Sequence, residues 1–123
     1  MPALNFDLRF AKAVASGKKT QTIRKVRKRP IKTGDRLILL TGHRTEECRQ
    51  LGSARCVYVA EVEVHENFLR VNGSILSVED ALCFAKKDGF RTVKAFRKWF
   101  RDHYGLPFFG VLIVWQFDQQ FEK

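Results

Sequence analysis

The chain has 123 residues, of which 45% are hydrophobic and 29% are charged. This length favours one domain over residues 1–123 because two domains would each have a very small core, and the composition excludes a disordered chain. The formal net charge is +10, and residues 1–36 carry +9 of it, because 11 Lys or Arg are balanced only by Asp7 and Asp35. Such a basic segment attracts polyanions, with nucleic-acid phosphates as the obvious partners.

The first third of the chain predicts a helix followed by two strands. Apolar residues at helical spacing predict a helix from about residue 6 to 16, which Asn5 can cap and Gly17 can end. Residues 18–26 then favour an extended conformation because Thr20, Thr22 and Ile23 are good strand formers. Pro30 ends this piece, and a Gly-Asp turn at 34–35 leads into a strand over residues 36–41.

The middle of the chain predicts a polar loop, a long strand and a hairpin. Residues 42–53 are polar and are expected to form a loop with a short helical turn. Alternation over residues 54–65 predicts a strand whose core-facing positions are Ala54, Cys56, Tyr58, Ala60, Val62 and Val64. Asn72-Gly73 is a two-residue hairpin signal between residues 68–71 and 74–76.

The last third predicts two helices and a buried strand. Ser77 followed by Asp80 resembles a capping box, and Thr92 can cap a second helix. Residues 108–117 are rich in β-branched and aromatic residues, as in a buried strand. Strands joined mostly by turns predict an α+β fold, a small mixed β-barrel rather than a doubly wound sheet.

Other features limit where the protein acts. The longest strongly apolar run is about half of the roughly 20 residues that a membrane helix needs, and residues 1–10 lack the pattern of a signal peptide. The three cysteines form no CxxC pair, so we expect reduced thiols and no metal site. These features predict a cytoplasmic protein without a membrane partner.

The segment with the most chemistry is GKKTQTIR, residues 17–24. A threonine hydroxyl becomes a nucleophile when a base takes its proton, and a lysine can be that base when burial or nearby cations lower its pKa. A lysine and a threonine beside a carboxyl group could therefore perform acyl transfer. Phosphate binding by the same Lys and Arg residues is the other interpretation of this segment, and the residues alone leave both open.

Four segments together resemble an ASCH domain, a relative of the PUA RNA-binding fold. They are GKKTQTIR, then KTGDRLIL, FAKKDGF and the closing FFGVLIVW, and the resemblance runs from Phe6 to Trp115. The resemblance implies a PUA-like pseudo-barrel in which helices flank a cleft lined by the Lys/Thr/Arg motif.

The resemblance also implies an activity, because members of this family include small bacterial amidohydrolases that deacylate N(4)-acetylcytidine. Their pattern, matched onto this chain, makes Lys19 the general base, Thr22 the nucleophile and Asp88 the proton donor, although Asp88 is one methylene shorter than the family's glutamate. Arg24 would steady the developing oxyanion, and no metal or organic cofactor is required. Strict alternation would instead place Lys18 on the face of Thr22; the resemblance favours Lys19.

Two further groups of residues are predicted to bind ligands. The expected contacts with the nucleoside are Arg24, Lys18, Thr20, Tyr58 and Trp115. The alternative function is an RNA-binding module that uses the Lys18–Lys32 stretch, with Lys25, Arg27, Lys28, Arg29 and Lys32 on phosphates. A metal-dependent ribonuclease ranks third because no paired-carboxylate site is visible.

Overall fold

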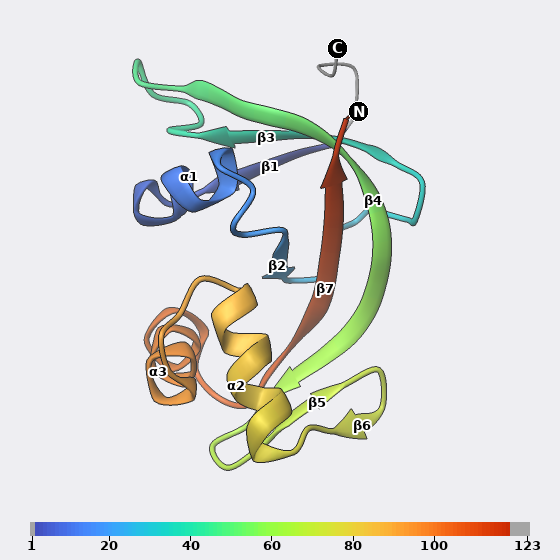
Figure 1. The fold of residues 1–123 in the computed structure, drawn as a ribbon, viewed down its shortest axis with the longest axis vertical. Coiled ribbons are helices and arrows are strands. Elements are labelled where there is room, and N and C mark those ends of the chain that lie inside the picture. The colour runs from blue at the N-terminus through green and yellow to red at the C-terminus, as the bar shows by residue number, and fades with distance from the viewer. Residues whose placement is uncertain (1, 119–123) are drawn as a thin grey trace.

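The computed structural model describes residues 2–118 (Figure 1). The elements in chain order are β1 (Ala3–Phe6), α1 (Leu8–Ala15), β2 (Gln21–Arg24), β3 (Arg36–Thr41), β4 (Arg49–Val64), β5 (Leu69–Val71), β6 (Ser74–Ile75), α2 (Val78–Lys87), α3 (Val93–Tyr104) and β7 (Phe108–Phe117). The fold is therefore mixed α+β, as predicted.

The sheet is built around the long, curved strand β4. One edge of β4 pairs antiparallel with β7 from Ala54 to Val64, and the other edge pairs with β3 in its first half and β5 in its second half. β1 extends the sheet as a parallel partner of β3, and β2 extends it as an antiparallel partner of β7. This gives the order β2-β7-β4-β3-β1, with β5 and β6 beside the far end of β4.

The sheet is not closed into a barrel, which corrects that part of the prediction. β1 and β2 are both edge strands, and no backbone ladder joins them in the described sheet. Arginine side chains cross the gap instead: Arg24 Nη2 donates to the Asn5 carbonyl oxygen at 2.6 Å, and Arg27 Nη2 donates to that of Ala3 at 3.5 Å. We call the gap between β1 and β2 the seam.

All three helices lie on the side toward which β4 curves (Figure 1). Between these helices and the sheet lies the core, whose largest fully buried side chains include Trp115, Phe96, Phe100, Leu4, Leu37 and Leu39. No helix among residues 2–118 is both long and apolar enough to cross a membrane.

The helix caps agree with the sequence at two of three sites. Ser77 Oγ accepts from the Asp80 amide at the start of α2, and Thr92 Oγ1 accepts from the Ala95 amide at the start of α3. The first cap is Asp7 and not Asn5, because residues 3–6 form β1. Leu4 and Phe6 of this strand are buried at alternate positions against the core, and the helical pattern that begins at Phe6 concealed it.

Two strand predictions also need correction. β4 begins at Arg49, so part of the predicted loop over residues 42–53 belongs to the sheet. A bulge between Cys56 and Tyr58 interrupts its alternation, and both Val57 and Tyr58 are exposed there. Tyr58 is therefore not a core-facing residue. β2 is shorter than predicted because the chain is still turning at Lys18 and Lys19 after α1, and because the strand ends at Arg24.

Candidate active site

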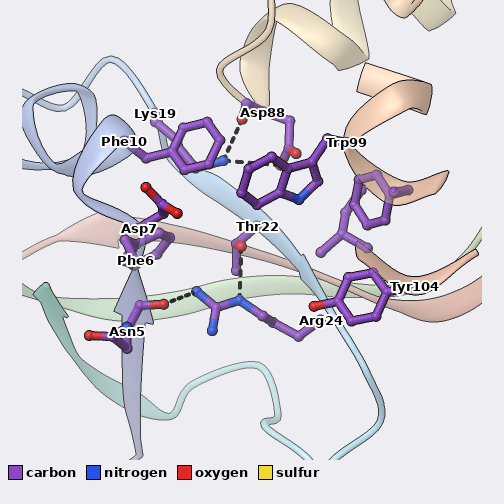
Figure 2. Close-up of a pocket in the computed structure, with 12 residues that line it drawn as sticks. Asn5, Phe6, Asp7, Phe10, Lys19, Thr22, Arg24, Asp88, Trp99 and Tyr104 are labelled. Atoms are coloured by element: carbon purple, nitrogen blue, oxygen red, sulfur yellow. Dashed lines mark hydrogen bonds and ion pairs between the residues drawn. The ribbon is translucent and has the colours of Figure 1, made fainter. Parts of the chain in front are cut away.

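A cavity of about 160 Å³ opens where the seam meets the ends of α2 and α3 (Figure 2). Its polar lining consists of Asn5, Asp7, Lys19, Thr22, Arg24 and Asp88. Its apolar walls are mainly aromatic, from Phe6, Phe10, Trp99, Phe100 and Tyr104. Segments from β1, α1, β2, α2 and α3 therefore meet around one small space. We call it the catalytic cavity, after the role that is proposed for it below.

Lys19 reaches this cavity because it precedes the regular part of β2. Gly17 has a φ of +84°, and the Lys19 amide donates to the Ala13 carbonyl oxygen at 2.9 Å, so the chain is still turning at Lys19. The pleat begins only at Gln21, and strict alternation therefore does not apply to the lysines. Lys19 is only 3% exposed, while Lys18 is exposed and does not line this cavity.

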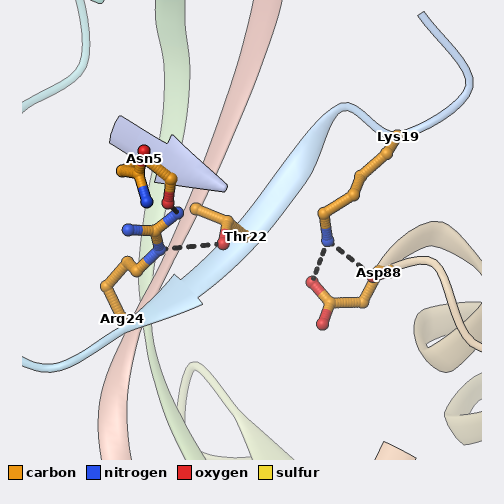
Figure 3. A network of polar contacts seen from close by, with 5 residues as sticks. All are labelled: Asn5, Lys19, Thr22, Arg24 and Asp88. Atoms are coloured by element: carbon orange, nitrogen blue, oxygen red, sulfur yellow. Dashed lines mark hydrogen bonds and ion pairs between the residues drawn. The ribbon is translucent and has the colours of Figure 1, made fainter. Parts of the chain in front are cut away.

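The Lys19 ammonium is held by Asp88. Nζ lies 3.2 Å from Asp88 Oδ1 and donates to the Asp88 carbonyl oxygen at 2.5 Å (Figure 3). Nζ also lies 4.9 Å from the centre of the Phe10 ring. Burial is the main cause that lowers the pKa of Lys19 below that of an ordinary lysine, while Asp88 opposes the shift.

Asp88 is placed by the end of α2. It is the C-cap residue of that helix, and its amide donates to the carbonyl oxygens of Phe84 and Ala85. The following Gly89 has a φ of +99°, and a Cβ there would lie 3.1 Å from the Phe10 ring, so a glycine suits this position. Burial raises the pKa of Asp88 above that of an ordinary aspartate, and the Lys19 charge opposes this shift. Desolvation thus favours the neutral form of both partners.

Thr22 and Arg24 lie on one face of β2, two residues apart, as alternation requires. Arg24 Nε donates to Thr22 Oγ1 at 3.1 Å while Nη2 holds the Asn5 carbonyl oxygen across the seam (Figure 3). No hydrogen bond joins Lys19 to Thr22 among the described side chains, and Figure 3 shows the amine directed toward Asp88. Lys19 and Thr22 thus share the cavity without direct contact.

The structure separates the other predicted nucleoside contacts from this cavity. Lys18, Thr20 and Tyr58 line a different groove, beside α2. Trp115 is 2% exposed and packs edge-on against Phe6 at a centroid distance of 5.5 Å, so its ring belongs to the core. Of that predicted set, only Arg24 lines the catalytic cavity.

The predicted RNA contacts lie on one exposed segment. Side chains of Lys25, Arg27, Lys28, Arg29 and Lys32 are all exposed in the connection between β2 and β3. None of them forms an ion pair with an acidic residue of the described chain. We call residues 25–32 the basic segment. It begins at the mouth of the cavity, where Lys25 Nζ lies 5.2 Å from the centre of the Tyr104 ring.

Sequence reasoning missed several cavity residues. Trp99 is half-buried at the border of the apolar face of α3, one position before the buried Phe100. Helical spacing does not distinguish an aromatic residue at such a position that lines a cavity from one that packs in the core. Asn5 contributes a backbone carbonyl group, which no side-chain pattern reveals. Asp7 was hidden because the helix was expected to begin before it.

Potential metal ligands are dispersed. Within residues 2–118, no three His, Cys, Asp or Glu side chains lie close enough together to hold an ion. The catalytic cavity contains two carboxylates, Asp7 and Asp88, and the second is already paired with Lys19.

Comparisons with known proteins define the fold. No protein-family model matches the sequence, and no curated protein matches it either. Three solved structures of ASCH from Zymomonas mobilis, namely ZmASCH itself and two mutants, superimpose with a TM-score of 0.55 at 16% or 17% sequence identity. The match covers 93% of this chain and 65–67% of theirs, so the chain spans about two thirds of their length. An identity this low establishes the fold alone: the chain has an ASCH-like fold.

Proposed function

We propose that the protein is an amidohydrolase that removes the acyl group from N(4)-acylcytidine-type nucleosides. One observation carries this proposal: a lysine, a threonine and an arginine from residues 19–24 line one cavity with a distant aspartate from the end of α2, and Lys19 and Asp88 are only 3% and 4% exposed. The cavity is smaller than the roughly 300–1,000 Å³ of a typical drug-sized site. It therefore suits the acylated end of a pyrimidine, with the ribose left at the mouth.

Thr22 is the proposed nucleophile. Its oxygen accepts a hydrogen bond from Arg24 Nε, so the hydroxyl proton is directed elsewhere and is free to leave. The nearby guanidinium charge also stabilises the alkoxide that forms. Arg24 Nη1 forms no hydrogen bond with a described residue, and it can donate to the oxyanion of the tetrahedral intermediate.

Lys19 and Asp88 are the proposed base and acid. The ion pair and the neutral pair hold the same number of protons, so desolvation can shift a proton from Lys19 to Asp88 without exchange with solvent. Neutral Lys19 then takes the Thr22 proton, and protonated Asp88 gives its proton to the leaving cytosine amine. In the second half, Asp88 takes a proton from the attacking water, and Lys19 returns one to Thr22.

Direct transfer from Thr22 to Lys19 requires one bridging water or rotation of the lysine side chain. Catalytic hydrogen bonds commonly tighten only when substrate is bound, and Lys19 has four rotatable side-chain bonds with which to adjust. The aromatic walls from Phe10, Trp99 and Tyr104 offer the ring faces that a pyrimidine needs. These residues replace Tyr58 and Trp115 in that role.

The decisive experiment is incubation of the purified protein with N(4)-acetylcytidine, with cytidine detected by chromatography. Thr22→Val, which keeps the shape and removes the hydroxyl, should abolish turnover, whereas Thr22→Ser should retain part of it. Lys19→Met should lower the rate by at least about 100-fold, and Lys18→Met should leave it unchanged. Absence of cytidine with the unmodified protein, or full activity of Thr22→Val, would refute the proposal.

RNA binding is the second candidate function. The observation that favours it is the basic segment, whose five exposed cations have no acidic partner within the described chain and begin at the cavity mouth. A hydrolase of free nucleosides has no need of so much charge. An RNA module without enzymatic activity would bind single strands and leave N(4)-acetylcytidine intact.

A further inference from the structure

Gln21 is a buried polar residue that takes no part in the contacts described above. It is the first residue of β2 and is only 4% exposed. Its Nε2 has no accessible surface and donates to no acceptor within the described chain. A buried amide in this state destabilises the fold, so an apolar side chain would suit the position better if packing alone decided. Because bulk solvent does not reach Nε2, the acceptor for this amide is to be sought inside the protein.

The Gln21 amide lies beside the end of α2, where Asp88 is located. Gln21 shares the groove beside α2 with Phe84 and Lys87 of the last helical turn, and Asp88 follows Lys87 as the C-cap residue. Burial raises the pKa of Asp88; Lys19 opposes this shift most strongly, and the Gln21 amide also opposes it as a hydrogen-bond donor. Nε2 is thus directed at the Asp88 carboxylate without completing a hydrogen bond to it.

The Asp88 carboxylate can accept this further donor. Lys19 Nζ contacts Oδ1, at 3.2 Å, and Oδ2 accepts no hydrogen bond from a described residue (Figure 3). The other titratable groups around the pair are Arg24 on β2, Asp7 and Arg9 at the start of α1, Lys86 and Lys87 at the end of α2, and Tyr104 on α3. None of these groups donates a hydrogen bond to the carboxylate in the described chain, so Gln21 is the residue that is placed to do so.

We propose that Gln21 is a positioning residue for Asp88, and that its amide completes a hydrogen bond to the carboxylate when Asp88 gives its proton to the leaving amine. This inference rests on the proposed deacylation. In that step the O–H bond of Asp88 breaks, the proton joins the cytosine amine nitrogen, and the bond between this nitrogen and the acyl carbon breaks. A donor directed at the carboxylate stabilises the form of Asp88 that the transfer leaves, and it therefore makes Asp88 a stronger acid.

Gln21 acts through Asp88 and does not touch the substrate. Adjacent residues of a strand point to opposite faces, so Thr22 lines the catalytic cavity while Gln21 does not. Loss of the Gln21 amide should therefore change the protonation of Asp88 and leave the binding surface for the substrate intact.

Titration of Asp88 tests the contact without any substrate. The carboxyl carbon of Asp88 can be followed by NMR in protein with isotope-labelled aspartate, and its signal is assigned by its loss in Asp88→Asn. The titration midpoint should move to higher pH in Gln21→Met, because the carboxylate loses a donor. It should not move in Gln116→Met, which removes an exposed amide on β7. An unchanged midpoint in Gln21→Met would overturn the proposal.

A second apolar variant distinguishes loss of the donor from a change in packing. Gln21→Leu and Gln21→Met differ in shape, but both remove an unsatisfied amide and should retain the thermal stability of the protein. Both should raise the Asp88 midpoint, and if one of them does not fold, the other decides. A midpoint that rises in one folded variant and not in the other would attribute the effect to shape and contradict the assignment.

Deacylation kinetics show whether the contact serves the reaction. Gln21→Met should lower kcat for N(4)-acetylcytidine by about tenfold, less than the roughly 100-fold or more that a whole general acid contributes, and it should leave KM unchanged. The acidic limb of the pH profile of kcat should move to higher pH together with the NMR midpoint, because the Lys19–Asp88 pair must hold a single proton to react. A purely structural role would move neither.

The two possible failures are distinguishable. If the unmodified protein forms no cytidine, the proposed function fails, and the role of Gln21 in deacylation fails with it. If the unmodified protein is active and Gln21→Met matches it in kcat and in pH profile, only the role of Gln21 is refuted.

Discussion

The Lys19–Asp88 pair is the most unusual pair of residues in the described chain, because both partners are charged types and both are buried. Removal of two charges from water is costly, and mutual attraction offsets the cost only with additional hydrogen bonds. Lys19 has one such bond, to the Asp88 carbonyl oxygen. A pair of this kind is poor evidence of optimised stability, and it is consistent with the chemical role that we propose for it.

Loss of one partner should therefore be costly. Asp88→Asn should lower the free energy of unfolding by about 3 kcal/mol, because it leaves the buried Lys19 amine without a counter-charge. The control is Asp102→Asn, which breaks the exposed Lys98–Asp102 pair and should cost far less, because water screens that pair, although it is shorter, at 2.7 Å. Urea denaturation measures both. Equal losses would contradict the burial argument.

The burial of the Lys19–Asp88 pair should also be visible in how the free energy of unfolding depends on pH. Burial raises the pKa of Asp88 in the folded protein above 3.8. The contribution of this group to the free energy of unfolding is therefore fully present below pH 3.8 and is lost as the pH rises through the pKa of the folded state. Burial lowers the pKa of Lys19 in the folded protein below 10.5. Its contribution to the free energy of unfolding therefore increases as the pH rises from the pKa of the folded state toward 10.5. The pair should therefore contribute least at intermediate pH.

The reference for this measurement is the apolar double variant Lys19→Met/Asp88→Leu, in which all other titrations cancel. Its advantage in unfolding free energy over the unmodified protein should be greatest at intermediate pH and should shrink toward both extremes. Denaturation curves across the pH range give this difference. A difference that does not vary with pH would show that the two groups titrate normally.

At the residue scale, the sequence predicted which side chains lie in one cavity, but it did not predict the contacts that they make there. Lys19, Thr22, Arg24 and Asp88 were named from the motif and the resemblance, and they line one cavity. Their partners could not be predicted: the Asn5 carbonyl group and the rings of Phe10 and Trp99 come from elements whose packing no local pattern encodes. Tyr58 was misplaced because a bulge leaves no mark in the alternation.

At the scale of elements, β2 shows how a short strand positions the site. In the described sheet its backbone pairs with no strand other than β7, through four residue pairs from Gln21–Val114 to Arg24–Val111. β7 approaches closely there because Gly110 has no side chain: a Cβ would lie 2.5 Å from the Arg24 carbonyl oxygen. Gly110 thus sets where Arg24, and with it Thr22, can lie.

Two glycine substitutions should distinguish displacement of the β2 backbone from simple crowding by a side chain. A Cβ at Gly110 would meet backbone, while one at Gly52 would meet the Phe117 ring at the same distance of 2.5 Å. Gly110→Ala should cost about 2–3 kcal/mol, and Gly52→Ala should cost less, since a ring can turn aside. Only Gly110→Ala should also impair deacylation. Thermal unfolding and the cytidine assay together test this, and the reverse order of cost would contradict it.

The elements themselves were largely predictable. Both helices of the α2–α3 pair, their caps, the Asn72–Gly73 turn and β7 follow from local signals that agree with the tertiary structure. β1 was missed because four residues are too few for periodicity to distinguish a strand from a first helical turn. Its identity as a strand depends on parallel pairing with β3, which is a nonlocal interaction.

At the scale of the whole molecule, charge is concentrated in one part of the chain. The basic segment leaves β2 beside the cavity mouth and remains exposed up to Lys32. Electrostatic binding of this kind depends on released counterions and therefore on salt. The molecule thus combines the cavity that we propose as a reaction site with the exposed basic segment that we propose as an RNA contact, and the two can be tested independently.

Replacement of residues 27–29 by glutamine should weaken binding of single-stranded RNA and reduce the slope of log K against log salt by about 2, since each lost phosphate contact contributes about 0.7. Turnover of free N(4)-acetylcytidine should remain unchanged, because none of these residues lines the cavity. Fluorescence anisotropy over a salt series measures the slope. A control with glutamine at Lys12 and Lys94, both exposed outside the basic segment, should leave the slope unchanged.

The open sheet could not be predicted from the sequence, because closure depends on whether β1 and β2 meet. Their separation has a mechanical result. One guanidinium, that of Arg24, ties the two free borders together while it also contacts Thr22. A ligand that draws the Arg24 guanidinium into the cavity must weaken its hydrogen bond to the Asn5 carbonyl oxygen. By thermodynamic reciprocity, a change that strengthens this hydrogen bond must lower the affinity for such a ligand. Occupancy of the cavity and hydrogen exchange of the β1 amides should consequently change together.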